Sequence, residues 1–411
     1  MSLTSTAKAT PWYFDPMTLL VAGCLVAIIN FGIRSTFGLF TLPISTSHQW
    51  PREIYSWAVA IQNLVWGVGT PIAGMLADRY GSARVLMSGA VLYALGLIGI
   101  NYSETGLMLD LTAGLLVGLG VAFSSFSIVM AALGRLVPPE KRSWAFGLAT
   151  ASGSLGQALF IWPVGQTIAS YGWQNCLVAL AVVVMIIIPL AAPLLVQNTS
   201  KSAGVKGEAA MSMGKAISEA FGHPSFLLLF FGFFVCGFQL AFITVHFPPY
   251  LAEHGISKEV GWLAMLLIGL FNVIGAYTSG IIGKSNVKRV PLAGIYFARA
   301  ALYTLYILTP ISTASTLIFA ACIGLLWLST IPLTMGLITV MFGTRYMATL
   351  YGFVFLSHQI GSFLGVWLGG KLYDIYGSYD VVWWMSVGLG VFAGLIHLPI
   401  REIRARAFAV A

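Results

Sequence analysis

The chain alternates long apolar runs with short polar connections. A membrane-spanning helix needs about 20 apolar residues, because each residue adds about 1.5 Å and the hydrocarbon core is about 30 Å thick. Runs such as 177–196 are continuously apolar, which excludes the alternating pattern of a membrane β-barrel. The pattern predicts an all-α membrane protein with twelve transmembrane helices, at residues 17–42, 54–77, 82–101, 107–136, 142–169, 174–196, 224–250, 258–282, 289–309, 313–341, 345–372 and 380–400.

Composition strengthens this prediction. Of the 411 residues, 58% are hydrophobic and 8% are charged, and the mean hydropathy is +0.89. A water-soluble domain would need far more charged surface. No small-residue cleavage site follows the first apolar run, so we expect an uncleaved first span rather than a signal peptide.

The chain shows no motif for a cofactor or for enzyme chemistry. Cys24, Cys176, Cys236 and Cys322 fall inside apolar runs without metal-ligand spacing, so we interpret them as packing residues. The chain has no Gly-rich loop ending in Lys-Ser or Lys-Thr that would bind the phosphates of ATP. We therefore expect no metal, no other cofactor and no enzymatic activity.

The charges are distributed unevenly among the connections. With both termini placed in the cytoplasm, 16 Lys and Arg residues fall on the cytoplasmic side, and three, Arg52, Lys258 and Lys371, fall outside. This asymmetry follows the positive-inside rule. The net charge of +8 therefore reflects topology, and we expect no nucleic-acid partner. We predict a multi-pass protein of the cell inner membrane, surrounded by lipids, that works as a monomer.

The two halves of the chain repeat each other at an offset of 205 residues. The offset keeps tryptophans and glycines in one register, pairing Trp57 with Trp262, Gly147 with Gly352, Gly156 with Gly361, Gly165 with Gly370 and Gly172 with Gly377. The one long polar connection lies between the copies. We predict an N-terminal six-helix bundle at residues 1–196, a cytoplasmic linker at 197–223 and a C-terminal six-helix bundle at 224–411.

The connection after the second span carries a motif. It reads Gly74-Met-Leu-Ala-Asp78-Arg79-Tyr-Gly81-Ser-Ala-Arg84, and a degraded copy at 280–289 occupies the matching place in the second half. Together with the twelve spans and the midpoint loop, these stretches resemble the major facilitator superfamily. The resemblance implies two pseudo-symmetric bundles that move a small-molecule substrate by alternating access.

The resemblance also implies a conformational latch in this loop. Asp78 would meet the amino end of a helix and nearby arginines, and so hold the cytoplasmic side closed. Arg79 and Arg84 belong to the same motif, and Arg135 at the foot of the fourth span is a further candidate partner. Lys284 inverts the charge at the matching position, so we expect one latch. The alternative is a solvated loop whose charges only fix the topology.

Two arginines lie within predicted spans, where an unpaired charge is costly. Arg34 lies past the middle of the first span, and the offset places Gln239 at the matching position of the second half. Arg34 either binds the substrate or extends its guanidinium to the outer interface. Arg299 lies in the ninth span, which is peripheral in this superfamily, so we expect a structural or interfacial role for it.

Other polar and aromatic residues within spans are candidate ligands. Asn63 and Trp66 of the second span could share a polar centre with Arg34. His358 and Gln359 lie together on the eleventh span. His358 could bind the substrate or carry a proton, because the unperturbed pKa of histidine lies near physiological pH. The alternative is that His358 makes only a helix–helix contact.

The acidic residues are as informative as the arginines. All 13 lie in connections or at span ends, so no carboxylate occupies the predicted membrane core. A carrier that exchanges cations for protons generally needs a carboxylate there. A guanidinium, by contrast, fits a substrate carboxylate with two parallel hydrogen bonds. The sequence therefore favours an anionic substrate.

Within the superfamily, Arg34-Ser35 in the first span resembles the monocarboxylate transporters and the bacterial oxalate:formate exchangers. Those families commonly carry an arginine after a glycine in the eighth span, and Ala276 stands at that place here. Asn272 and Tyr277 of the same span could instead donate hydrogen bonds to a substrate.

The sequence thus predicts a secondary transporter of a small organic anion, foremost a monocarboxylate, working by proton symport or anion exchange. The predicted substrate ligands are Arg34, Trp66, Asn272, Tyr277, Trp327, His358 and Gln359. Helix packing is the alternative role for the tryptophans. An uncharged or planar heterocyclic solute, such as a vitamin or drug-like compound, is the alternative cargo. A channel would need rings of pore-lining residues, and a non-transporting sensor would need a soluble signalling domain.

Overall fold

The structure is a computed structural model, and it describes residues 16–50, 52–125, 128–130, 132, 134, 137–194, 211–284 and 287–408. These residues form helices and no strand. In the first half the elements are α1 Pro16–Ser35, α2 Phe37–His48, α3 Arg52–Tyr80, α4 Ser82–Ile100, α5 Gly106–Leu109, the π-helical segment η2 Asp110–Leu116, α6 Val117–Phe123, α8 Pro139–Tyr171, α9 Trp173–Met185 and α10 Ile187–Ala191.

The second half follows the same plan. Its elements are the short α12 Met213–Phe221, then α13 Pro224–Glu253, α14 Lys258–Ile282, α15 Arg289–Leu308, α16 Thr313–Leu326, α17 Thr330–Phe342, α18 Met347–Tyr376, α19 Asp380–His397 and the 3₁₀ turn η3 Arg406–Phe408. The predicted division into domains at 197–223 stays a prediction, because much of that linker lies outside the described residues.

Within the described ranges, eleven helical stretches are long and apolar enough to cross a membrane, and they match eleven of the predicted spans. The remaining prediction, 142–169, corresponds to α8, whose 33 residues would extend about 50 Å. α8 is less apolar because it carries polar side chains such as Thr150, Ser154 and Gln157. It packs between α1 and α14, so part of this polar surface is covered by protein.

Several spans are interrupted near their middle. The first span breaks at Thr36 between α1 and α2, and the tenth breaks at 327–329 between α16 and α17. A break frees backbone groups that lipid cannot satisfy, so such segments persist only where protein or a water-filled cavity meets them. The two breaks are therefore candidate positions for a substrate-binding site.

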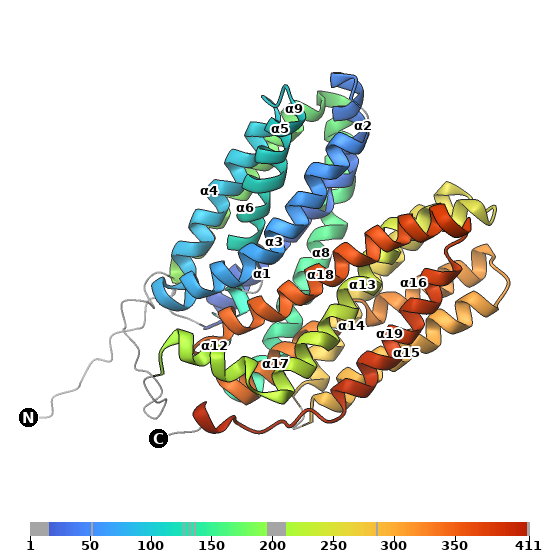
Figure 1. Ribbon diagram of the computed structural model, residues 1–411. Coiled ribbons are helices and arrows are strands. Elements are labelled where there is room, and N and C mark those ends of the chain that lie inside the picture. The colour runs from blue at the N-terminus through green and yellow to red at the C-terminus, as the bar shows by residue number, and fades with distance from the viewer. Residues whose placement is uncertain are drawn as a thin grey trace, which may run out of the picture.

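The helices form two groups, which Figure 1 colours blue to green and yellow to red. The groups meet mainly along α3 with α18 and α8 with α14, and α8 also contacts α17. Glycines make both crossings close: a Cβ added to Gly147 would lie 2.7 Å from Cα of Gly280, and one added to Gly352 would lie 2.6 Å from Cα of Pro71. Gly147 and Gly352 are 205 residues apart, so matching positions of the two halves make matching contacts.

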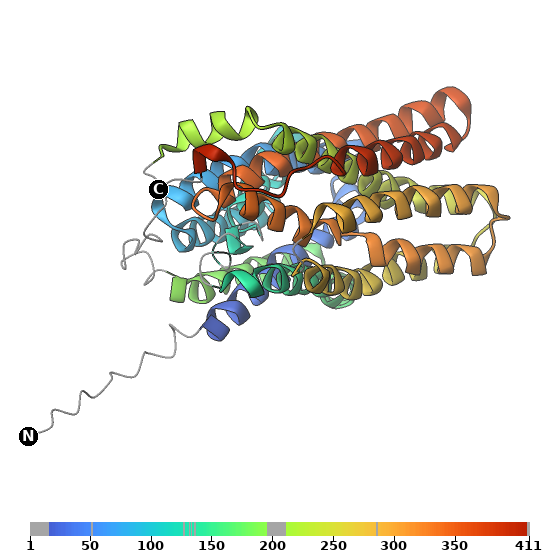
Figure 2. The ribbon, with the colours of Figure 1, turned by 90° about the horizontal axis from the view of Figure 1, so that it is seen from below.

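The groups approach at one end and diverge at the other. They meet near α12 and α17 and separate toward α9 and α16 (Figure 1). Seen from below, the long helices run side by side, with α12 and the segment after α19 at the end where the groups meet (Figure 2). At this end Glu402 accepts hydrogen bonds from the backbone N–H groups of Lys288 and Arg289 at 2.7–2.9 Å and caps α15. Burial lowers the pKa of Lys288, and the charge of Glu402 acts in the opposite direction.

Candidate functional site

Arg34 lies in the last turn of α1, beside the break in the first span. The Thr36 hydroxyl donates to the carbonyl of Ile33 at 2.8 Å and so supports this broken end. The half-buried guanidinium donates from Nη2 to Oδ1 of Asn63 at 2.6 Å. Its Nε is buried and has no hydrogen-bond partner. In the described part of the chain, no carboxylate pairs with this guanidinium.

Two aromatic rings flank the Arg34 guanidinium. Its central carbon lies 5.8 Å from the ring centre of Phe37 and 5.9 Å from that of Trp66. Both distances are within the range of cation–π attraction, which compensates part of the lost hydration. A ring face accepts no strong hydrogen bond, however, so the donors of Arg34 remain available to a ligand with oxygen atoms.

Asn63 connects the two halves. Its side-chain oxygen accepts from Arg34, and its backbone carbonyl accepts from Nε2 of Gln359 on α18 at 3.1 Å. The Gln359 oxygen then lies 3.1 Å from Nδ1 of His358, so that nitrogen must carry the hydrogen. A continuous path of hydrogen bonds therefore runs from Arg34 to His358 across the interface between the halves.

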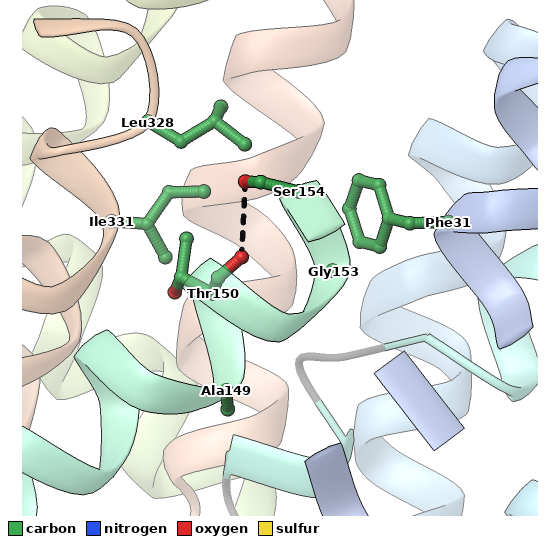
Figure 3. Close-up of a pocket in the computed structure, with 7 residues that line it drawn as sticks. All are labelled: Phe31, Ala149, Thr150, Gly153, Ser154, Leu328 and Ile331. Carbon is green, nitrogen blue, oxygen red and sulfur yellow. Dashed lines mark hydrogen bonds between the residues drawn. The ribbon is translucent and has the colours of Figure 1, made fainter. Parts of the chain in front are cut away.

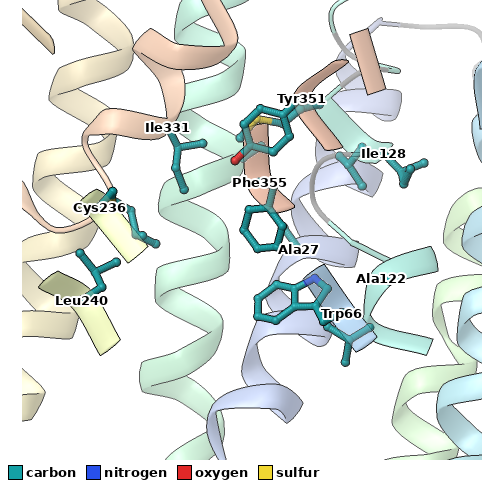
Figure 4. Packing of buried hydrophobic residues seen from close by; sticks show 14 of the residues in the cluster. Ala27, Trp66, Ala122, Ile128, Cys236, Leu240, Ile331, Tyr351 and Phe355 are labelled. Carbon is teal, nitrogen blue, oxygen red and sulfur yellow. The ribbon is translucent and has the colours of Figure 1, made fainter. Parts of the chain in front are cut away.

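An aromatic row accompanies this path. The rings of Trp66 and Phe355 lie 5.0 Å apart, and Phe355 stacks on His358 with ring centres 5.3 Å apart and planes 9° apart. In Figure 4, Trp66, Phe355 and Tyr351 form a column with Cys236 on one side and Ala122 on the other. The site thus has an apolar wall in which few polar groups are exposed to a ligand.

A small cavity, with room for no more than about one water molecule, lies next to this cluster. It is lined by Phe31, Ala149, Thr150, Gly153, Ser154, Leu328 and Ile331. Figure 3 shows the Phe31 ring on one side and Leu328 and Ile331 on the other, with α8 between them. The cavity therefore lies between the halves, one helical turn along α1 from Arg34.

The break in the tenth span forms one wall of the cavity. The freed N–H of Leu328 donates to Oδ1 of Asn272 at 3.0 Å, and Nδ2 of Asn272 donates to the Ser154 hydroxyl of α8 at 2.8 Å. Asn272 is fully buried, and both ends of its amide are engaged. It therefore connects the break to the other half of the molecule.

Arg299 supports the same break from α15. Its Nε and Nη2 donate to the carbonyl of Leu326 at 3.2 and 2.6 Å, and Nη2 also donates to the carbonyl of Trp327. Nη1 donates to Oε1 of Gln239 at 3.3 Å and to the sulfur of Cys236 at 3.5 Å. The guanidinium is completely buried and every nitrogen has an acceptor. No donor remains for a substrate.

The predicted ligands divide into three groups in the structure. Arg34, Trp66, His358 and Gln359 lie together at the centre. Asn272 and Trp327 lie at the break in the tenth span. Tyr277 lies about 140° around α14 from Asn272 at 100° per residue, and its side chain is 40% exposed. Tyr277 is thus outside the central cluster, and the ligand role of each residue stays a prediction.

The structure adds residues that the sequence did not single out as ligands. Asn63 was assigned only to a general polar centre, yet it contacts both Arg34 and Gln359. Phe31 and Phe355 each lie one turn from a predicted ligand on the same helix, which is the signal that could have identified them. In the described part of the chain, no cluster of three His, Cys, Asp or Glu side chains could hold a metal ion.

The predicted latch residue Asp78 contacts the amino end of α18. Its carboxylate accepts from the backbone N–H of Thr349 at 3.0 Å and from the Thr349 hydroxyl at 2.8 Å. A carboxylate is favoured there by the unpaired amides of the first turn. Because Asp78 belongs to the first half and Thr349 to the second, this contact joins the halves at the end where they meet.

The arginines of the motif are placed differently. Arg79 is exposed, and its guanidinium lies 5.2 Å from the ring centre of Tyr80. Arg84 is exposed as well. Arg135 lies outside the described residues. In the second half, Lys284 lies 6.0 Å from the ring of Trp144, a weak cation–π contact.

Comparison with known proteins places the chain in a family. Residues 23–366 match the sequence profile of the Major Facilitator Superfamily. The uncharacterized MFS-type transporter YcxA of Bacillus subtilis is 25% identical over 88% of this chain and 88% of its own. Monocarboxylate transporter 13 of Rattus norvegicus is 26% identical over 90% of this chain and 85% of its own. Monocarboxylate transporter 2 of Homo sapiens is 25% identical over 84% of this chain and 76% of its own.

A solved structure shows the same fold. The proton:xylose symporter XylE bound to 6-bromo-6-deoxy-D-glucose superposes with a TM-score of 0.69 and 12% identity, covering 96% of this chain and 98% of that one. This likeness confirms the twelve-helix architecture predicted from the sequence. The chain belongs to the Major Facilitator Superfamily and is a multi-pass membrane transporter that resembles the monocarboxylate transporters.

Proposed function

We propose that the protein transports a small organic anion, a monocarboxylate, which binds at Arg34 between the two bundles. The observation that carries this proposal is the guanidinium itself, which lies within a span with one amide acceptor, a buried Nε without a partner and no paired carboxylate in the described ranges. A carboxylate would supply the missing charge and accept two parallel hydrogen bonds. The monocarboxylate transporters among the relatives support the same cargo.

The position of the site fits alternating access. The guanidinium lies beside the Asn63–Gln359 contact between the bundles, and the Asp78–Thr349 contact is a second one between them, at the amino end of α18. The conformation is accordingly outward-facing, with the cytoplasmic side closed by the Asp78 latch. An anion bound to Nη2 of Arg34 would displace the side-chain oxygen of Asn63. Because the backbone carbonyl of Asn63 accepts from Gln359, this change would reach the second bundle. The bundles would then rock about the site.

We assign the coupling between anion transport and proton movement to His358. Its Nδ1–H donates to Gln359, and the other half of that amide reaches Asn63, the partner of Arg34. A proton gained at Nε2 would give His358 a positive charge near the bound anion. Proton and anion would then be bound at the same time, as symport requires. Anion exchange is the competing mode, in which His358 stays neutral and the returning cycle needs a second anion.

A second cargo class is favoured by two specific observations. Ala276 stands where related transporters commonly have an arginine, and Trp66 and Phe355 present ring faces 5.0 Å apart. An uncharged or planar heterocyclic solute could stack there without needing Arg34.

Uptake by proteoliposomes would distinguish the two cargo classes. Radiolabelled butanoate and a neutral vitamin would be offered to wild type, Arg34→Gln and Arg34→Lys. We expect butanoate uptake by wild type, partial uptake by Arg34→Lys and none by Arg34→Gln. Neutral-solute uptake that survives Arg34→Gln would contradict the anion proposal. Uptake that loses its dependence on a pH gradient in His358→Gln would support symport.

A further inference from the structure

We infer that the hydrogen bond between Asn272 and Ser154 is a latch within the membrane, which stabilises the outward-facing form and is released in each transport cycle. In this role Asn272 is a positioning residue for transport, because it acts on the broken tenth span instead of on the cargo. The inference rests on the alternating access of the proposed function and is independent of the identity of the substrate.

The bond lies on the crossing of α8 and α14, between the two bundles. The helices are closest at Gly147, where an added Cβ would lie 2.7 Å from Cα of Gly280. Ser154 lies seven residues, or about 10.5 Å, farther along α8. Asn272 and Ser154 are both buried, and the amide donates to the hydroxyl at 2.8 Å. Because hydrogen-bond distances span only about 0.5 Å, a movement that separates the two glycines would also strain this bond.

The other crossing, of α3 with α18, has a matching contact. At the 205-residue offset, Asn272 matches Gly67 and Ser154 matches Gln359. This second pair also touches, because a Cβ added to Gly67 would lie 2.7 Å from Cβ of Gln359. Gln359 donates to the carbonyl of Asn63 at 3.1 Å. Each crossing therefore carries, at an equivalent place, one side-chain amide that joins the second bundle to the first.

Asn272 connects the latch to the break in the tenth span. Its Oδ1 accepts from the freed N–H of Leu328 at 3.0 Å. The carbonyls of Leu326 and Trp327 accept from Arg299, which lies in the same bundle as the break. Arg299 thus holds the break from within the second bundle, whereas Asn272 also reaches the first. When Ser154 moves away, the amide can turn, and the N–H of Leu328 loses its fixed acceptor.

Ser154→Ala is the variant that tests the latch, and Thr150→Val is its matched control. Both hydroxyls lie on α8 and donate to the carbonyl four residues earlier, Thr150 to Phe146 at 2.8 Å and Ser154 to Thr150 at 3.1 Å (Figure 3). Both residues are buried. Only the Ser154 hydroxyl accepts from Asn272 across the interface, so the pair separates the loss of the latch from the loss of a hydroxyl.

The test measures hydrogen–deuterium exchange of the purified full chain without substrate. In Ser154→Ala we expect exchange to be about two- to twelvefold faster, the factor that corresponds to one net hydrogen bond, at residues 143–150, at 276–282 and at the amide of Leu328. Exchange at 158–168, in the other half of α8, should stay as in wild type. Thr150→Val should match wild type throughout. Ser154→Cys keeps a weak acceptor and should give an intermediate rate.

Three outcomes would overturn the latch. Exchange that is faster along the whole of α8, including 158–168, would mean that Ser154→Ala only loosens the helix. Unchanged exchange, or an equal effect of Thr150→Val, would remove the special role of the Asn272 bond. Each of these would leave the anion proposal standing, because Arg34-dependent uptake tests that proposal. Conversely, uptake that survives Arg34→Gln would overturn the anion proposal and leave the latch intact.

Discussion

Arg34 in the first half and Arg299 in the second half both lie well inside spans, but their hydrogen bonding differs. Arg299 is completely buried and donates to two backbone carbonyls, an amide oxygen and a sulfur. Arg34 is half-buried and donates to one amide oxygen, while its Nε has no partner. Gln239, which stands at the position matching Arg34, is an acceptor for Arg299.

The difference separates a cation whose hydrogen bonds the fold satisfies from one whose hydrogen bonds it leaves incomplete. The five donors of a guanidinium are costly to bury unless acceptors meet them. Around Arg299 the broken tenth span supplies those acceptors, so arginine and backbone satisfy each other. Around Arg34 the described residues supply one acceptor, the Asn63 oxygen, and leave the buried Nε without one, as the proposed anion site requires. Substitutions of Arg299, Arg34 and Asn63 test this contrast.

Arg299→Gln should destabilise the fold severely. The substitution leaves the carbonyls of Leu326 and Trp327 without a donor, and each unsatisfied buried group costs about 1–3 kcal/mol. We expect a loss of about 3–5 kcal/mol, seen as a large fall in the melting temperature of the purified protein. Arg299→Lys can reach fewer acceptors than arginine, so its melting temperature should lie between those of wild type and Arg299→Gln. A melting temperature like that of wild type would remove the structural role of Arg299.

Arg34→Gln should show the reverse pattern. Removing the charge takes away a ligand for the anion, which costs about 3 kcal/mol or more than a hundredfold in affinity. Stability should stay the same or rise, because the variant no longer holds an unsatisfied cation. Transport assays and thermal denaturation on one preparation would measure both. If Arg34→Gln unfolds as readily as Arg299→Gln, the contrast between the two arginines is lost.

Asn63→Asp should act as an internal competitor of the substrate. The new carboxylate would stand where the Asn63 oxygen lies, 2.6 Å from Nη2 of Arg34, and would neutralise it. We expect anion affinity to fall at least about tenfold, or 1.4 kcal/mol, and the melting temperature to rise. Gln239→Glu is the matched control, because it adds a carboxylate to the saturated Arg299 and should leave anion affinity unchanged. Equal loss in both variants would argue against Arg34 as the binding site.

Asp78→Asn should have the smallest effect. It weakens a charge-assisted contact with the first turn of α18, worth about 1 kcal/mol at a helix amino end. Hydrogen–deuterium exchange should rise at residues 347–350 as the cytoplasmic side opens more often. Arg79→Gln is the control, because the Arg79 side chain is exposed and lies over Tyr80. Unchanged hydrogen–deuterium exchange at residues 347–350 in Asp78→Asn would mean that the Asp78 carboxylate does not stabilise the first turn of α18.

Individual residues show how far sequence reasoning reached. It selected Arg34 and Asp78 as charges that need a partner, because burial cost and helix-end chemistry are local properties, and their roles stay predictions. It assigned Asn272 to the substrate, but that amide is engaged on one side by Leu328 and on the other by Ser154. The break at 327–329 was not among the sequence predictions, so the acceptors of Arg299 and the partners of Asn272 were not predicted either.

The sequence by itself determined the class of the protein. Apolar run length, the positive-inside asymmetry and the 205-residue repeat follow from insertion into lipid and from duplication, and each can be read along one dimension. Only the tertiary structure decided which polar groups satisfy one another. That pairing joins residues up to 296 positions apart, as between Asn63 and Gln359, and depends on distances of a few tenths of an ångström that no linear pattern contains. The candidate site is therefore defined by which groups remain unpaired once the helices have packed.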